Sequence, residues 1–276
     1  MSESETMISS AYVILPWRSE FGTWIMNYVR FVNGFRHVAH QLVVCCRKGD
    51  EALFPAATSF FYDWEQVPDA QKNTKLLKSS VNAEYLDQLR ERLQEQFYGH
   101  TIVDPVLKPR IDTDWDFTPT PKIRRGLYAD VVIAPRYRTH GEHRNFEHWS
   151  AVAEGLMDAG YTVAAVGAKE TSVDIPNLSD YSWNHDNLDS AIELMQSAKL
   201  VVTTESGMGH LAVLAGAPLK VIYERRGREA GHPTWRWNLP HMQAYSKNHC
   251  EPILMGWNDP AKVVAESIHY VSNSRD

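Results

Sequence analysis

Short apolar runs alternate with segments of helical periodicity along this chain, and this alternation constrains its fold more than any other feature. In the first half the apolar runs are 11–16, 41–46 and 57–62, and apolar side chains recur at helical spacing from Ile25 and over 83–98. Continuous apolar runs of this length are typical of parallel strands that are buried on both faces of a sheet. The first half is therefore predicted to be α/β.

The same alternation begins again in the second half of the chain. Predicted strands lie at 128–134, 161–166, 200–203 and 219–223. Predicted helices start at Trp149, Leu188, Ser206 and Pro260. Strands and helices that alternate at these spacings indicate parallel sheets with right-handed crossovers.

A proline-rich stretch, 101–126, separates the two halves. Its prolines disfavour a long helix, and its composition is typical of a connection between domains. A length of 276 residues also falls between one large domain and two modest ones. We therefore expect two Rossmann-like parallel-sheet domains, residues 1–110 and 127–276, joined by a linker at 111–126.

The net charge of −6 is divided evenly between the two halves. Residues 1–122 carry 16 acidic and 13 basic side chains, and residues 123–276 carry 18 and 15. A dedicated nucleic-acid-binding protein usually has a basic half, face or tail. The charge distribution does not favour that class, although a local basic cleft is compatible with it.

The cysteines and the apolar runs indicate in which cellular compartment the protein is expected. Three cysteines, two of them adjacent, do not form a disulfide framework, which favours a reducing compartment. The apolar runs are far shorter than the roughly 18 residues that a membrane span needs. The first ten residues are polar and acidic and lack the features of a signal peptide. We expect a cytoplasmic protein with no membrane span.

Arginines follow the predicted strands of the second half. Arg136, Arg138 and Arg144 come after the strand at 128–134, and Arg225 is the first residue of another cluster, after 219–223. Ligands of open α/β sheets bind beyond the carboxyl ends of the strands, and arginine suits bidentate contact with phosphate. This pattern predicts a site for a dianion such as a pyrophosphate.

The segment ESGMGHLAVLAGAP, 205–218, is the most specific motif in the chain. Ser206 and Gly207 open a predicted helix whose first N–H groups have no intrahelical partner, and such a helix end attracts anions. Gly207 and Gly209 allow the backbone to approach closely. The glycines match neither the dinucleotide-binding fingerprint nor a phosphate-binding P-loop.

Residues 128–224 resemble the C-terminal domain of glycosyltransferase family 9, the ADP-heptose lipopolysaccharide heptosyltransferases. The family segment D-[ST]-G-x-x-H-L-A-x-A-x-x-x-P is matched by Glu205 through Pro218, and its G-Y-x-V strand by Gly160 through Val163, with Gly167 and Glu170 after it. The resemblance implies the GT-B fold, in which two Rossmann-like domains face each other across a cleft. The last helix would then return toward the first domain.

The resemblance also assigns roles to residues. The positions expected to bind the donor are Arg138 or Arg144, Glu170, Glu205, Ser206, Gly207, Met208, Gly209, His210 and Arg225. Glu205 replaces the family's aspartate. In the first domain, Thr23 stands where the family has an acceptor-activating aspartate, so Glu20 is the candidate catalytic base. Asp63 is a weaker candidate for contact with the acceptor.

The implied reaction transfers a sugar from a nucleoside-diphosphate donor to the hydroxyl of a saccharide or other acceptor. Arginines and helix N–H groups would neutralise the leaving group without a metal, and the nucleotide sugar would be a co-substrate with no further cofactor. The D-x-D sequence at Asp112 to Asp114 lies in the predicted linker and not at the end of a predicted strand.

Three alternative functions stay open. The acceptor could be DNA or a nucleobase, or the enzyme could be a nucleotide-sugar 2-epimerase that acts on the donor itself. The third is a non-catalytic nucleotide-sugar-binding protein. This alternative stays open because Thr23 replaces the family's aspartate and threonine cannot serve as the base.

Overall fold

The computed structural model describes residues 10–16, 24–62, 80–105, 120–137, 145–167, 171–176, 178–180, 188–223, 242–243, 246, 249–254 and 256–274. The chain separates into two compact units, Met1–Thr118 and Pro119–Asp276. Glu20, Asp63, Arg138, Arg144, Glu170 and Arg225 lie outside the described residues.

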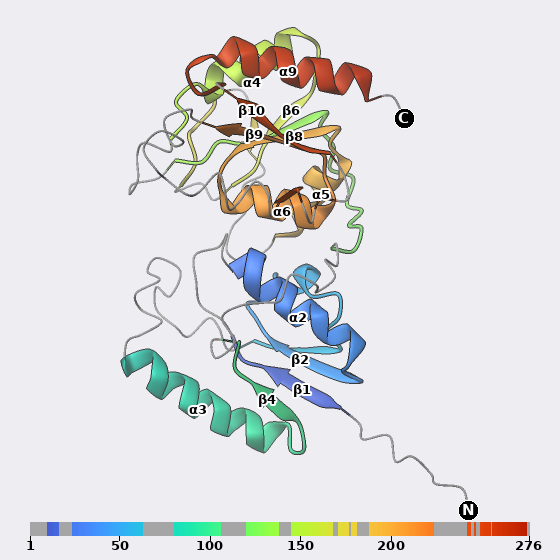
Figure 1. Ribbon diagram of the computed structural model, residues 1–276, viewed down its shortest axis with the longest axis vertical. Coiled ribbons are helices and arrows are strands. Elements are labelled where there is room, and N and C mark those ends of the chain that lie inside the picture. Colours follow the sequence, from blue (N-terminus) through green and yellow to red (C-terminus); the bar gives the residue numbers. More distant parts are fainter. Residues whose placement is uncertain are drawn as a thin grey trace, which may run out of the picture. The chain divides into compact units, whose positions relative to one another are not determined.

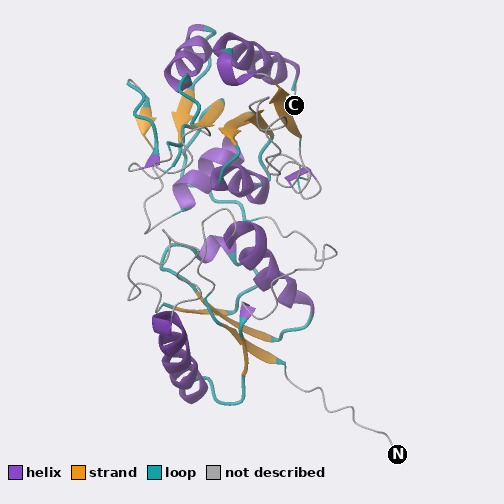
Figure 2. Ribbon diagram, turned by 60° about the vertical axis from the view of Figure 1, so that its left-hand side comes forward, coloured by secondary structure: helices purple, strands orange, loops and turns teal. Residues whose placement is uncertain are grey.

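The first unit has a four-stranded sheet of order β3-β2-β1-β4, in which every pairing is parallel. Its strands are β1 (Ala11–Ile14), β2 (Gln41–Cys45), β3 (Ser59–Phe61) and β4 (Thr101–Val103). Helical segments join them: η1 (Trp24–Val29), α2 (Arg30–Gly34), η2 (Phe35–His37), η3 (Glu51–Leu53) and α3 (Ser80–Gln96). α3 and α2 cover opposite faces of this sheet (Figures 1 and 2).

α3 packs on the sheet through the apolar stripe that its sequence predicts. Leu89 and Leu93 are buried against alternate residues of the two central strands, among them Val13 and Val43. Residues two apart along a strand point to the same face, so the residues between them face η1 and α2. The free cysteines Cys45 and Cys46 are buried, as predicted for this strand.

Two features of the first unit differ from the sequence prediction. β4 lies at the start of the stretch interpreted as a proline-rich connection, and its pairing with β1 was not expected. The helix predicted from Ile25 is a π-helical turn followed by a short α-helix and a 3₁₀ turn. Apolar spacing at i, i+3 and i+4 cannot distinguish these three helical types, because it defines one face in each of them.

The second unit has a six-stranded parallel sheet of order β10-β9-β8-β5-β6-β7. Its strands are β5 (Val131–Ala134), β6 (Val163–Ala165), β7 (Ser179–Asp180), β8 (Leu200–Thr204), β9 (Leu219–Tyr223) and β10 (Cys250–Leu254). Its helices are α4 (Trp149–Asp158), α5 (Asp189–Ser197), α6 (Gly207–Ala215), η9 (Gly256–Asn258) and α9 (Pro260–Asn273). α4 and α9 cover one face and α5 and α6 the other (Figure 1).

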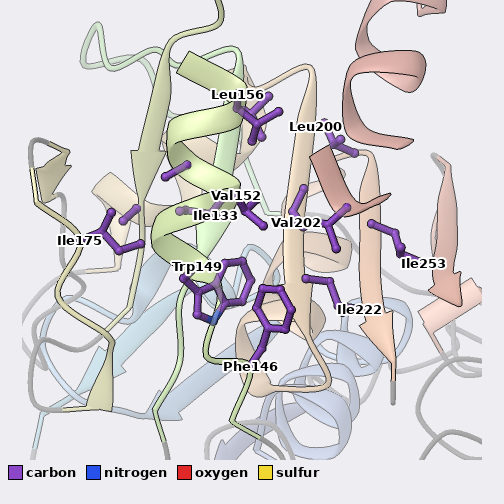
Figure 3. Close-up of a cluster of buried hydrophobic side chains, with 14 of the residues drawn as sticks. Ile133, Phe146, Trp149, Val152, Leu156, Ile175, Leu200, Val202, Ile222 and Ile253 are labelled. Carbon is purple, nitrogen blue, oxygen red and sulfur yellow. The ribbon is translucent and has the colours of Figure 1, made fainter. Parts of the chain in front are cut away.

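The core beneath α4 and α9 is the largest described cluster of buried side chains. Val202 and Ile222 from neighbouring strands lie on the side of Phe146 and Trp149, and Ile253 extends the same cluster farther along the sheet (Figure 3). The Trp149 and Phe146 rings make an edge-to-face contact with centroids 5.1 Å apart. Trp149 is fully buried and therefore belongs to the core.

The segment that enters the second unit is bound tightly to α5. The carboxylate of Glu193 accepts hydrogen bonds from the backbone N–H groups of Arg125, Gly126 (2.7 Å) and Leu127 (3.3 Å). Gly126 has φ +88°, a left-handed conformation that glycine adopts without strain. Residues 120–126 of the predicted linker therefore belong structurally to the second unit.

The predicted α/β fold with two parallel sheets is confirmed, and several elements have the predicted limits, notably β9 and α9. β10 was missed because it contains Pro252, which argues against a strand. Its position at the sheet edge explains why the proline is tolerated there. Among the described helices, none combines the length and apolar character that crossing a membrane requires.

Candidate functional site

The order of strands in the second sheet creates a switch point between β5 and β8. From β5 the chain proceeds to β6 and β7 on one side, and then returns to β8, β9 and β10 on the other. Loops at the carboxyl ends of β5 and β8 diverge to opposite faces, and ligands of open α/β sheets bind in the crevice that this divergence creates. The turn from β8 into α6 and the residues after β5 therefore define the candidate site.

The turn from β8 into α6 is built on two buried hydroxyl groups. Thr203 donates from Oγ1 to the carbonyl oxygen of Thr204 (2.9 Å), and its Oγ1 lies 3.1 Å from Oγ of Ser206. Since the single Thr203 proton is used on Thr204, Ser206 is the donor to Thr203. Ser206 is the N-cap residue of α6 but makes no side-chain capping bond to the helix. The first backbone N–H groups of α6 are thus not occupied by the Ser206 hydroxyl.

α6 is a thin helix that lies close to the sheet. A Cβ atom on Gly209 would stand 3.3 Å from Cγ2 of Thr203 and 3.2 Å from Cε of Met242. Packing of the helix against β8 and Met242 therefore leaves little room for a side chain at this glycine. Its role in backbone approach to a ligand stays a prediction. His210 is buried, with 9% of its surface exposed.

A glycine in the left-handed conformation ends α6. Gly216 has φ +76°, and its N–H and that of Ala217 bond to the carbonyl oxygens of Val213 and Ala212, both at 3.0 Å. This left-handed cap ends the helix before Pro218, whose carbonyl accepts from Val201 N. Both ends of α6 are fixed by residues of the motif at 205–218.

The residues after β5 are tied to the residues after β6. Tyr137 N donates to the carbonyl of Thr171 (2.8 Å), and Val173 N donates to that of Pro135 (2.6 Å). Gly167 has φ +148°, and a Cβ atom there would lie 2.6 Å from Oγ of Ser172. These contacts fix the backbone of Arg136, which belongs to the predicted arginine cluster, at the carboxyl edge beside the switch point.

Tyr223, at the end of β9, is a polar residue of this edge that the sequence prediction did not identify. Thr204 pairs with Ile222, so the next residues, Glu205 and Tyr223, are neighbours across the two strands. Burial raises the pKa of the Tyr223 hydroxyl, and the charge of Glu205 raises it further. Tyr223 was overlooked because it is the last residue of a strand that is otherwise mostly apolar. Its position at the carboxyl end of the strand, where ligands bind, could have identified it.

Of the residues predicted to bind the donor, the structure describes Glu205, Ser206, Gly207, Met208, Gly209 and His210. It brings these six together at the start of α6. Within the described ranges no three His, Cys, Asp or Glu side chains are grouped as metal ligands would be.

The carboxyl edge of the first sheet carries a buried ion pair. Arg47 Nε lies 2.9 Å from Oδ2 of Asp50, and the Arg47 guanidinium carbon lies 5.8 Å from the centre of the Trp24 ring. Burial raises the pKa of Asp50 to about 6, against the lowering effect of Arg47. The Tyr28 hydroxyl donates to the carbonyl of Cys45 (3.2 Å). These contacts fix the residues directly after β2.

Comparison with sequence families matches residues 129–233 to glycosyltransferase family 9 (heptosyltransferase). The match includes the turn into α6 and the segment after β5. It confirms the resemblance predicted from the sequence. No curated protein matches the chain significantly.

Solved structures support the same assignment at the level of the fold. A glycosyl transferase family 9 structure from Veillonella parvula is 13% identical, with a TM-score of 0.57, and the match covers 97% of this chain and 99% of that one. ADP-heptose lps heptosyltransferase II of E. coli is 14% identical (TM-score 0.57; 95% and 98% covered), and E. coli heptosyltransferase WaaC with ADP is 11% identical (0.50; 94% and 98%). The predicted GT-B fold class is confirmed.

Proposed function

Given that residues 129–233 match glycosyltransferase family 9 and that the chain has the GT-B fold, we propose that it transfers a sugar from a nucleoside-diphosphate donor to an acceptor hydroxyl. The observation that carries the proposal is the start of α6 at the switch point of the second sheet. Its first N–H groups lie beside Ser206 and are not capped by that side chain. A diphosphate is the group that such a helix end favours.

The donor would bind with its diphosphate at Ser206, Gly207 and Met208, whose backbone forms the first turn of α6. Helix N–H groups, and the arginines that we expect at this edge, would stabilise charge that develops on the leaving nucleoside diphosphate. One of the similar structures is E. coli heptosyltransferase WaaC with ADP, which supports a nucleotide as part of the donor. Because these groups supply the positive charge, we expect transfer without a bound metal.

The acceptor would be a saccharide or another hydroxyl-bearing molecule. In the transfer, the acceptor oxygen bonds to the anomeric carbon as the bond from that carbon to the diphosphate oxygen breaks. The acceptor proton passes to a carboxylate, for which Glu20 is our candidate, and Asp63 would contact the acceptor. Arg138 or Arg144, Glu170 and Arg225 complete the proposed donor site, with His210 and Glu205.

Binding of nucleotides tests this proposal directly. Thermal unfolding with ADP, GDP and UDP at millimolar concentration should show a stabilising shift with at least one of them, since a ligand that binds only the folded state stabilises it. Glu20→Gln should abolish transfer and leave the shift unchanged. If no nucleotide shifts unfolding, the donor site is refuted, and unchanged turnover of Glu20→Gln would refute the base.

The same assays separate the alternatives. Isomerisation of the nucleotide sugar in the absence of an acceptor would indicate an epimerase, and retention of DNA at moderate salt would indicate a nucleic-acid acceptor. Nucleotide binding without turnover would indicate a binding protein. We also propose a cytoplasmic location, because the three cysteines are free and buried.

A further inference from the structure

The hydroxyl of Tyr223 is a buried polar group without a partner. Tyr223 is 7% exposed, and its OH has no hydrogen-bond partner in the part of the chain that the structure describes. Buried polar atoms in folded proteins are nearly always hydrogen-bonded, because an unmade bond costs the group its hydration without compensation. An orphaned hydroxyl at the functional edge of a sheet therefore requires an explanation.

Strand geometry places this side chain on the face where α6 begins. Ile222 points into the core beneath α4 and α9 (Figure 3), so Tyr223, one residue further, points to the opposite face. That face is covered by α5 and α6 (Figure 1). Because α6 follows β8 directly, its first turn lies at the carboxyl edge, where Tyr223 also lies.

Register brings the same side chain beside the turn itself. The pairing of Thr204 with Ile222 puts Glu205, the residue before the N-cap Ser206, next to Tyr223. Glu205 acts on Tyr223 electrostatically and is not its hydrogen-bond partner. The charge of Glu205 and the burial both raise the pKa of the hydroxyl, so that it stays protonated and can only donate or accept as a neutral group.

We propose that the Tyr223 hydroxyl donates a hydrogen bond to a diphosphate oxygen of the donor bound at the first turn of α6. The bound diphosphate supplies the acceptor that the folded chain lacks, and the hydroxyl complements the helix N–H groups. The phenol keeps its proton throughout: when the bond from the anomeric carbon to the diphosphate oxygen breaks, the electron pair stays on that oxygen and the hydrogen bond shortens. This inference rests on the proposed function, of which it specifies one binding residue.

Tyr223→Phe separates a ligand-binding role from a structural one. The variant removes only the oxygen, and because that oxygen has no partner in the chain, the ligand-free variant should unfold at the same temperature as the wild type or higher. Binding of a nucleoside diphosphate should nevertheless weaken about tenfold or more, the usual size of a lost hydrogen bond to a charged group. If the hydroxyl had only a structural role, Tyr223→Phe would be less stable than the wild type and would bind the nucleoside diphosphate with unchanged affinity.

Tyr161→Phe is the matched control. Tyr161 precedes β6 in the same unit, at the amino edge of the sheet, and its hydroxyl lies 2.9 Å from Oγ of Ser272. Loss of this hydroxyl should leave nucleotide affinity unchanged. The comparison therefore isolates the position of Tyr223 from the general effect of removing a tyrosine oxygen.

The test is titration calorimetry of the full chain with ADP, GDP and UDP, combined with thermal unfolding of each ligand-free protein. Weaker binding by Tyr223→Phe alone, with undiminished stability, supports the inference. Wild-type affinity in Tyr223→Phe, or a ligand-free variant less stable than the wild type, overturns it while the proposed function stands. If the wild type binds none of the three, the proposed function fails and the inference fails with it.

Discussion

The hydroxyl oxygens of Thr203 and Ser206 lie 3.1 Å apart at the end of β8, and this bond turns the Ser206 side chain away from the helix that it precedes. A serine at an N-cap ordinarily accepts a bond from the N–H of the second or third helical residue. Here that capping bond is not made, and of the first-turn N–H groups that of Gly209 donates to the Ser206 carbonyl oxygen (3.1 Å), so the diphosphate is expected at the N–H groups of Gly207 and Met208. A residue of β8, Thr203, thus holds the N-cap side chain of α6 in a position that does not cap the helix.

Two substitutions of Ser206 should distinguish the contribution of its hydroxyl to nucleotide binding from that of the helix N–H groups. Ser206→Asp brings a carboxylate that itself caps the helix and repels an anion, so nucleotide affinity should fall at least about tenfold. Ser206→Ala removes the hydroxyl without adding charge, and should change affinity by only a few-fold. Calorimetric titration of ADP, GDP and UDP measures both. Equal losses in the two variants would contradict the N–H groups as the main diphosphate ligands.

Gly209→Ala should lower the stability of the protein and not only its affinity for a ligand. The added Cβ would lie 3.3 Å from Cγ2 of Thr203, on the strand, and 3.2 Å from Cε of Met242. Such overpacking costs about 1–3 kcal/mol unless a neighbour gives way. Met242 is itself buried, so Met242→Ala also lowers stability. The loss in the double variant should nevertheless be smaller than the sum of the two single losses, because Met242→Ala removes one of the two close contacts. Urea unfolding of the single and double variants measures this coupling, and additive losses would show that Met242 is not the obstacle.

The buried pair of Arg47 and Asp50 predicts a pH dependence of stability. Burial raises the pKa of Asp50 to about 6, above its unfolded value near 3.8. The folded state therefore binds a proton more tightly, and stability is expected to fall as pH rises from about 4 through about 6. The full effect is up to about 3 kcal/mol. Asp50→Asn cannot titrate, so its stability relative to the wild type should increase over this range.

Urea unfolding of both proteins at about pH 4 and about pH 7 measures this difference. A difference that does not change with pH, or a wild type that gains stability relative to Asp50→Asn as pH rises, would show that Asp50 is ionised at little cost in the folded chain.

Glu193 should control the order of the segment that enters the second unit. One carboxylate oxygen accepts from three successive backbone N–H groups, those of Arg125, Gly126 and Leu127. Glu193→Leu removes every one of these bonds, and each is a net loss of about 0.5–1.5 kcal/mol, since these half-buried or exposed residues can bond to water instead. Hydrogen exchange of these three amides should accelerate, while the amides of β5 keep most of their protection. Unchanged exchange at 125–127 would rule out this role.

Strongly periodic segments were predictable from the sequence, and segments defined by tertiary pairing were not. β9 and α9 have the predicted limits because an apolar run and a proline at the first helical position mark them unambiguously. β10 was missed because Pro252 disfavours a strand in isolation, whereas an edge position tolerates it. β4 was missed because its three residues begin the stretch 101–126, whose prolines indicated a connection between domains.

In the candidate site, too, some features were predictable from the local sequence and others depend on strand pairing. The motif at 205–218 predicted where α6 begins and ends, because Ser206 and Gly216 have local conformational reasons to be there. The roles of Thr203 and Tyr223 depend on which strands are neighbours and on which face a side chain points. Neither is fixed until β8 and β9 pair, so the motif alone could not reveal them.

Titration of the wild-type chain with ADP, GDP and UDP in the presence of EDTA tests the central claim most directly. A diphosphate held by helix N–H groups and arginines, without a metal, should bind with one site per chain for at least one nucleotide. It should bind equally well with and without the chelator. No measurable heat for any of the three at millimolar concentration, or binding that EDTA abolishes, would contradict the account.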